Sequence, residues 1–265
     1  MIPQAEDFKA ESLGLHALLS DVVPEHFDEK TQFKDWTIND VLQHLHHWNL
    51  MAWWSLTNEA QFTAVLNEMV DSGLGMRGFE EKKLEGTKGK ELLDMWHEGF
   101  LKVSGDFADA DPKQRLKWAG PEMSARSSIT ARLMETWAHG QEIYDHLGAP
   151  RVNTDSIKNI AYLGVNTFGY CHMVREIPVP ENKPYVKLTA PSGDIWEWNE
   201  PNDKNFVEGD AGEFCLVVTQ ARNIAEVNLK VVGDVASQWM SIAQCFAGPA
   251  EDPPAVGTRF TKKVG

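Results

Sequence analysis

Histidines gather on one predicted helix of this chain, and their spacing suits a shared site. His44, His46 and His47 lie within four positions of a segment that we expect to be helical from Trp36-Thr37 to beyond Trp53. Residues three apart share a helix face, so His44 and His47 can point the same way while His46 points elsewhere. The helix is otherwise apolar, which predicts that at least one imidazole faces the protein interior.

A carboxylate and an imidazole occupy neighbouring turns of a later predicted helix. Glu135 and His139 stand at i and i+4, so their side chains project from one face. Such pairs also occur by chance on solvated helix surfaces, which is the competing interpretation. The flanking residues here are mostly apolar, and a buried carboxylate and imidazole need partners or an ion. A third ligand from an antiparallel helix would complete a three-ligand site that suits zinc or iron(II).

These residues must be positioned by helices, and the first part of the chain has the pattern for them. Apolar spacing and turn signals predict helices over 5–19, 37 to beyond 53, 59–69, 88–107 and 127–147, with a glycine-rich loop over 73–78. Thr37 is a plausible N-cap, and Asp40 nearly completes a capping box. Four long helices with short connections predict a bundle.

The later part of the chain changes to strand patterns. We expect a helix over 155–174, a hairpin from strands 185–189 and 195–198, a strand at 228–232 and a closing helix over 235–246. The apolar run 214–219 fits either a strand or a helix. We therefore predict two domains: a metal-binding four-helix bundle over residues 1–150, and a linking helix with a small α/β domain over 151–265.

Composition narrows the classes of partner. The 265 residues carry a formal net charge of −14, which argues against nucleic acid or an anionic membrane as the main partner. The first residues are polar and acidic, and no apolar run reaches membrane-spanning length, so we expect no secretory signal, no membrane span and a cytoplasmic location. Three dispersed cysteines predict buried thiols in a reducing compartment. The sequence leaves the oligomeric state open.

Two motifs resemble those of a known superfamily. The run Trp36 to Leu45, WTINDVLQHL, resembles the W-T-x-x-D-V-x-x-H-L motif of DinB-like metal-dependent bundles, in particular the mycothiol-dependent maleylpyruvate isomerase type. The run Thr130 to Gln141 looks still closer to an uncharacterised metal-binding branch of that superfamily. The stretch from Val207 to Arg222 is similar to the sterol-carrier-protein-like α/β domain that follows the bundle in those isomerases.

The resemblance implies a ligand set and a chemistry. It places a divalent metal, zinc or iron, on His44, Glu135 and His139, where the metal activates a low-molecular-weight thiol. The implied function is isomerisation of a conjugated acid or transfer of a thiol to a small electrophile. Arg222 aligns with an arginine of the isomerases and is a candidate clamp for a substrate carboxylate; a structural salt bridge is equally compatible. Lys is about twice as frequent as Arg, unlike in the Arg-rich proteins of mycothiol-making bacteria, so the thiol stays open.

Other residues keep two interpretations each. His47 could be a fourth metal ligand, a group that contacts a ligand, or a proton carrier. The alternative is a packed or partly exposed histidine with no role at the site. Arg132 could pair with a surface acid, and His146 is expected at the surface. The tryptophans at 36, 48, 53, 54 and 137 could line a pocket or fill the core. Two other functions stay open. One is a non-catalytic module that binds a metal or a small ligand, in which the ion would have a closed shell of protein ligands. The other is a metal-dependent hydrolase or lyase.

Overall fold

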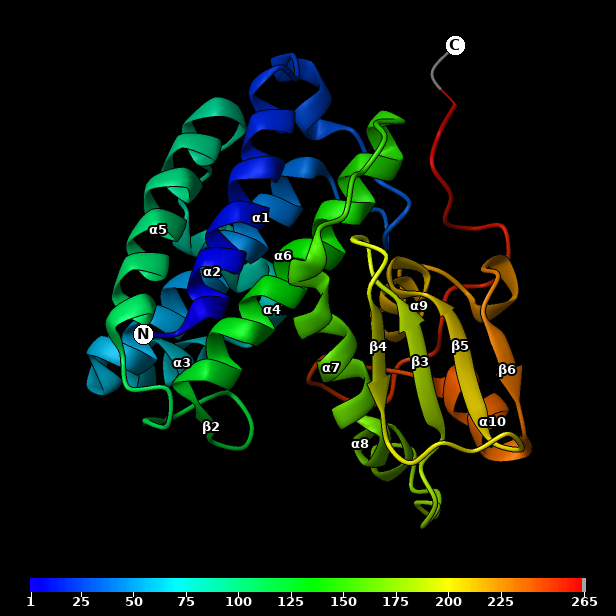
Figure 1. Cartoon of the computed structure of the whole chain (residues 1–265). Coiled ribbons are helices and arrows are strands. Elements are labelled where there is room, and N and C mark those ends of the chain that lie inside the picture. Colours follow the sequence, from blue (N-terminus) through cyan, green and yellow to red (C-terminus); the bar gives the residue numbers. More distant parts are fainter. Residues whose placement is uncertain (264–265) are drawn as a thin grey trace. The chain divides into compact units, whose positions relative to one another are not determined.

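The computed structural model describes residues 1–263 and divides into two compact units, Met1–Ile143 and Tyr144–Gly265. The chain is rich in helices and has a small four-stranded sheet (Figure 1). The division between the units falls inside the longest helix. Within residues 1–263, no helix combines the length and the apolarity that a bilayer crossing requires.

The first unit is helical apart from a two-residue strand pair. Its elements are α1 (Pro3–Ser20), the 3-10 helix η1 (Pro24–Asp28), α2 (Ile38–Thr57), α3 (Glu59–Ser72), α4 (Gly75–Lys83), α5 (Gly89–Asp109), β1 (Arg115–Leu116), β2 (Met123–Ser124) and α6 (Ala125–Leu147). Helix α5 packs against both α1 and α2. It buries an apolar stripe at helical spacing, formed by Leu92, Leu93, Trp96, Phe100, Val103 and Phe107.

Helix α2 begins at a complete capping box. The Thr37 hydroxyl accepts from the Asp40 amide at 3.1 Å, and the Asp40 carboxylate accepts from the Thr37 amide at 2.7 Å. An aspartate therefore fills the position where glutamate or glutamine is usual. This start fixes the phase of the helix, and most of its side chains are buried, among them the imidazoles of His44, His46 and His47.

The predicted loop over residues 73–78 is wrong, because helix α4 begins within it. Gly73 and Gly75 have positive φ angles of 63° and 69°, which turn the chain sharply before the helix starts. Helix α4 is short and polar, but it buries Phe79 and Glu80 completely and packs on α2. Tertiary packing thus overrides a weak local helix propensity.

The second unit combines helices with a mixed sheet. Its elements are the 3-10 helix η2 (Asp155–Ile157), α7 (Lys158–Asn166), α8 (Phe168–Met173), β3 (Tyr185–Thr189), β4 (Ile195–Trp198), β5 (Phe206–Asp210), α9 (Ala211–Val218), the 3-10 helix η3 (Ile224–Glu226), β6 (Lys230–Val232) and α10 (Asp234–Ile242). The strand order is β4-β3-β5-β6 (Figure 1). Strands β3 and β5 are parallel, and the other two pairings are antiparallel.

The predicted hairpin is confirmed, whereas other boundaries in this unit differ. The helix expected over 155–174 is divided at Thr167, whose hydroxyl donates to the carbonyls of Leu163 and Gly164 and helps to end α7. Residues 214–218 of the ambiguous run 214–219 belong to helix α9, whose start is capped by the Asp210 carboxylate as it accepts from the Glu213 amide at 3.0 Å. Strand β5 was not predicted.

Two buried histidines of α2 make the stability of the first unit sensitive to acid. Burial lowers the pKa of His46 to about 4, and it also lowers the pKa of His47 to about 4 against the opposing charge of Glu80. In the unfolded chain both would titrate near the ordinary value of about 6.5. As the pH falls below that value, these histidines bind protons in the unfolded state but not in the folded state. The free energy of unfolding therefore decreases down to about pH 4.

We therefore expect the free energy of unfolding to fall by on the order of 2–3 kcal/mol per buried histidine between pH 6.5 and 4. Urea unfolding of the wild type and His46→Leu across this range measures the effect. The variant should lose about half of the dependence that the two histidines cause, whereas His26→Leu, at an exposed position, should keep it all. Equal pH profiles for wild type and His46→Leu would contradict the assignment.

Candidate metal centre

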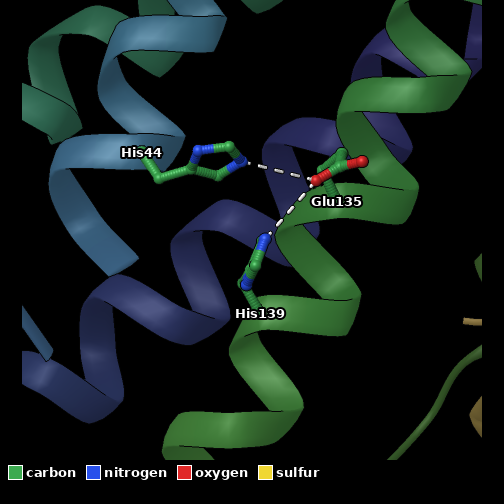
Figure 2. Close-up of side chains that lie close together, drawn as sticks. All are labelled: His44, Glu135 and His139. Carbon is green, nitrogen blue, oxygen red and sulfur yellow. Dashed lines mark ion pairs between the residues drawn. The ribbon is translucent and has the colours of Figure 1, made fainter. Parts of the chain in front are cut away.

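Three side chains from two helices converge on one point of the first unit. His44 projects from α2, and Glu135 and His139 project from successive turns of α6 (Figure 2). One Glu135 oxygen lies 3.7 Å from Nε2 of His44 and 3.5 Å from Nε2 of His139. The three potential ligand atoms all lie within 4.8 Å of one another. Two imidazole nitrogens and a carboxylate oxygen at this spacing can hold one metal ion.

A second carboxylate orients each imidazole. Nδ1 of His44 donates to Glu80 at 2.9 Å, and Nδ1 of His139 donates to Glu142 at 3.0 Å. An ionised carboxylate can only accept, so each ring carries a proton on Nδ1, and its Nε2 lies towards Glu135. Carboxylate–histidine–metal arrays in proteins use this arrangement to fix the tautomer and the ring plane.

Glu80 is held by several donors at once. Its side chain is fully buried, and it accepts from Nε1 of Trp48 at 3.0 Å and from Arg77 at 2.6 Å, in addition to His44. Arg77 also pairs with the Asp40 carboxylate at the start of α2. Burial alone would raise the pKa of Glu80, but the contacts with His44 and Arg77 outweigh it and lower the pKa. Helix α4 therefore supplies a charged acceptor that locks the His44 ring.

The electrostatics of the three central residues favour a cation between them. Burial would raise the pKa of Glu135, but its contacts with His139 and His44 and the charge of Arg132 hold it well below the ordinary value. Burial would lower the pKa of His139, but Glu142 and Glu135 raise it to about 10. Without an ion, a proton on His139 thus partly neutralises the surrounding carboxylates.

A count of charges at the centre matches a divalent ion. The carboxylates of the ligands and their neighbours are Asp40, Glu80, Glu135 and Glu142, and the guanidiniums are Arg77 and Arg132. With neutral imidazoles these groups leave a formal charge of −2. Buried charge is costly unless it is compensated, so the donor set and the charge together fit an ion such as zinc or iron(II).

Aromatic rings cover one side of the centre. The Trp36 ring stacks on His139 with centroids 5.7 Å apart and 7° between the planes, and Phe33 meets His139 edge-on at 5.3 Å. Positive φ angles at Lys34 and Asp35 turn the chain between these two aromatics. The cation of Arg77 lies over the Trp36 ring, 4.6 Å from its centroid. Trp36 therefore supports the His139 imidazole of the candidate centre.

Sequence comparison identifies the family. A model of the mycothiol maleylpyruvate isomerase N-terminal domain matches residues 8–144, just over half of the chain. The chain belongs to this family. All three residues of the candidate centre lie inside the matched region. Two uncharacterized proteins from strains of Mycobacterium tuberculosis are 35% identical to the chain over 247 residues, which is 93% of this chain and 96% of theirs.

Solved structures extend the likeness beyond the matched domain. The crystal structures of a mycothiol-dependent maleylpyruvate isomerase and of its histidine-to-alanine mutant both align with a TM-score of 0.52. Each alignment covers 81% of this chain and 87% of the isomerase at 14% identity. At that identity the likeness concerns the fold, and this family member shares the isomerase fold over most of its length.

The remaining candidates from the sequence lie elsewhere or pack differently. Within residues 1–263, no fourth histidine, cysteine or acid joins the group of three, so His47 lies outside it. The His47 ring packs edge-on against Trp48 and Phe79, and its role as a proton carrier stays a prediction. His146 is buried, contrary to expectation, and its Nδ1 lies 3.0 Å from the Lys262 ammonium.

Arg222 belongs to the second unit, where Asp145 already occupies its guanidinium. The two nitrogens of Arg222 donate to the two oxygens of Asp145 at 2.6 Å each, and the Thr261 hydroxyl adds a 2.7 Å contact to the same carboxylate. A substrate carboxylate at Arg222 would have to replace Asp145. The geometry matches the salt-bridge alternative, and the clamp stays a prediction.

Loss of this ion pair should destabilise the second unit. The side chains of Arg222 and Asp145 are only 12% and 5% exposed, so Arg222→Met leaves a buried carboxylate without its main partner. We expect a loss of about 3–5 kcal/mol in the free energy of unfolding, measured by urea denaturation. The double variant with Asp145→Leu should recover part of that loss. A loss below about 1 kcal/mol would show that the pair contributes no more than an exposed one.

Sequence reasoning missed Glu80, Arg77 and Glu142. Glu142 stands three residues after His139, so the extended spacing Glu135-x-x-x-His139-x-x-Glu142 was a usable signal. Glu80 is 36 residues from His44 on helix α4, which was not predicted, and no local pattern points to it. Arg132, expected to pair with a surface acid, is instead buried and donates to Asn49 at 2.9 Å.

Proposed function

We propose that this protein is a metal-dependent enzyme that uses a low-molecular-weight thiol on a small electrophilic or conjugated acid. The observation that carries the proposal is the convergence of His44 Nε2, His139 Nε2 and Glu135, with each imidazole oriented by its own carboxylate. Family membership adds that the matched domain is named for a mycothiol-using isomerase. We further propose zinc as the ion, with iron as the alternative, and the cytoplasm, where the three buried free cysteines would stay reduced, as its location.

The same proposal extends to the architecture. The helices α1, α2, α5 and α6 would form the DinB-like four-helix bundle, and the mixed sheet with α9 and α10 would correspond to the sterol-carrier-protein-like domain. The bundle supplies rigid helices for the ligands, which holds a site more precisely than loops do.

The arrangement of the chain's own groups suits thiol activation. His44, Glu135 and His139 would hold the ion, and Glu80 and Glu142 would keep both imidazoles in the binding tautomer. A bound zinc ion would supply Lewis acidity that keeps a thiol deprotonated at neutral pH. Trp36 and Phe33 provide an apolar wall that limits water at one side. Three protein ligands would leave a coordination position open, as in catalytic zinc sites, and this supports an enzyme over a binding module with a closed structural site.

Cobalt substitution tests thiol binding without knowledge of the substrate. We expect the cobalt(II)-loaded protein to develop a sulfur-to-cobalt charge-transfer band when a small thiol such as cysteamine is added. The band should be missing in Glu135→Gln. If the cobalt protein binds one equivalent of metal but shows no such band with cysteamine, glutathione or mycothiol, the thiol function is wrong and a hydrolase or lyase becomes the better account. A positive band justifies a screen of conjugated acids for isomerisation or thiol addition.

Metal binding should release a proton. Because the pKa of His139 is raised to about 10 in the metal-free protein, its imidazole is protonated at pH 7 and must lose that proton to bind through Nε2. Apparent zinc affinity should therefore rise with pH between 6 and 9. Titration calorimetry in buffers of different ionisation enthalpy should count about one proton released per ion at pH 7. An affinity that is independent of pH would contradict the protonated state of His139.

A further inference from the structure

A buried arginine without an ion-pair partner lies beside the candidate metal centre. Arg132 stands on α6 one turn before Glu135 and is 3% exposed. Its Nε donates to the Asn49 side chain at 2.9 Å, but no carboxylate among residues 1–263 lies within 4.0 Å of the guanidinium. Burial lowers the pKa of Arg132 to about 10, so the group still carries its charge at neutral pH. The charges of Glu135 and Glu80 act on Arg132 and partly offset the cost of its burial, but neither acid forms a hydrogen bond with the guanidinium.

Two hydrogen-bond donors of this pair have no acceptor. Nη2 of Arg132 and Nδ2 of Asn49 are both buried without a partner. Because Oδ1 of Asn49 accepts from Arg132, its Nδ2 must be the donating side of the amide. Asn49 is itself 1% exposed. One charged and one neutral donor thus belong to two side chains in contact, and a carboxylate supplies the two acceptor oxygens that they lack.

The position of the Arg132–Asn49 pair along helices α2 and α6 can be compared with that of the candidate metal ligands. His44 on α2 faces Glu135 on α6, whereas Asn49, further along α2, contacts Arg132, which comes earlier on α6. The two helices are therefore antiparallel here, and the Arg132–Asn49 pair lies about one helical turn, roughly 5 Å, from Glu135. A small conjugated acid spans such a distance between its carboxylate and its unsaturated carbons. The Glu135 side chain is 22% exposed, so solvent reaches the ligands from its side.

We propose that Arg132 and Asn49 form a carboxylate subsite that holds a small acid next to the metal centre. The subsite rests on the proposed function, because it assigns the substrate class as an acid whose charged end lies about one turn along α6 from the ion. It gives the chain two specificity residues: Arg132 and Asn49 both donate to the acid, and Asn49 also positions the guanidinium. The alternative occupant of two unsatisfied donors is a buried water molecule, which needs no negative charge.

A comparison of crotonate with its neutral counterpart crotonamide shows whether the subsite binds an acid or holds only water. Titration calorimetry on the zinc-loaded wild type should detect crotonate binding and little or no crotonamide binding. Arg132→Met should weaken crotonate binding about tenfold or more, as expected for a lost charge-assisted contact. Arg126→Met, an exposed arginine on the same helix, should bind like the wild type. Equal binding of acid and amide, or no binding of either, would overturn the subsite and leave water as the occupant.

A second variant covers the case in which Arg132→Met does not fold. Asn49→Asp places a carboxylate against the guanidinium at unchanged size, so it should raise the thermal unfolding midpoint and abolish crotonate binding. Unchanged crotonate affinity in Asn49→Asp would overturn the proposal. Zinc content of the same samples separates the two hypotheses. If the protein binds zinc but crotonate binding does not depend on Arg132, only the subsite is wrong. If crotonate binding depends on Arg132 but the protein takes up no metal, the metal-dependent function is wrong and the subsite stands.

Discussion

Glu135→Gln should abolish tight metal binding while the fold stays intact. Glu135 lies between the two imidazoles, 3.7 Å and 3.5 Å from their Nε2 atoms, and it is the charged member of the group. Replacement of residues that only orient ligands costs about 10–100-fold in metal affinity, so loss of the ligand charge itself should cost more than about a hundredfold. Competition titration against a zinc chelator measures the change. The amide keeps the size of the side chain, so circular dichroism should match the wild type.

Glu98→Gln provides the matched control for this variant. It removes the same charge from an exposed position of α5, in the same unit. We expect its zinc affinity to equal that of the wild type within error. If Glu135→Gln binds zinc as tightly as Glu98→Gln does, Glu135 is not a ligand and the group of three is wrong.

Glu80→Ala should lower both metal affinity and stability. Glu80 is fully buried and accepts from His44, Trp48 and Arg77, so its loss frees the His44 ring, leaves the Trp48 indole without its acceptor and removes one ion pair of Arg77. Removal of one member of a buried charge pair costs about 3–5 kcal/mol. Loss of the carboxylate that orients a metal-binding imidazole costs about 10–100-fold in affinity. Urea unfolding and zinc competition titration measure the two effects separately.

Trp48→Phe distinguishes orientation of His44 from general destabilisation. It removes one donor to Glu80 and leaves the His44 contact in place. It should therefore cost about 1 kcal/mol of stability, as for a single hydrogen bond, with little change in zinc affinity. An equal loss of zinc affinity in Trp48→Phe and Glu80→Ala would mean that Glu80 supports the fold and does not orient His44.

The start of α2 and the shared face of Glu135 and His139 on α6 could be predicted from local spacing. Thr37 and Asp40 mark the start of α2, and Glu135 and His139 share one face of α6 by the periodicity of any helix. That His44 lies opposite Glu135 followed from the apolar character of both helices and from the motif resemblance. The strands 185–189 and 195–198 follow from alternation and an intervening turn, and both formed as expected.

Contacts between segments that are distant in the sequence could not be predicted, nor could elements whose own residues have a weak helix or strand propensity. Helix α4 is short, polar and rich in glycine, so its own residues argue against a helix, and only its packing on α2 creates one. The residues that orient His44 come from this helix. Strand β5 was missed for a related reason: it contains Gly209 with a φ of 155° and is stabilised by pairing with β3 and β6 on both sides.

The buried polar network was also beyond local patterns. Arg132 looked like a surface residue because arginine on a helix usually is one. Its burial follows from the close packing of α6 on α2, where Asn49 accepts from its Nε. His146 was misplaced for the same reason, since its partner Lys262 is 116 residues away.

Elemental analysis of the protein purified without added metal or chelator is the most direct test of the metal centre. We expect about one zinc or iron ion per chain in the wild type and none in His44→Ala, whose replaced side chain comes from α2 and not from the helix that carries Glu135 and His139. Absence of metal in the wild type, with no uptake when zinc or iron(II) is titrated in, would contradict the account.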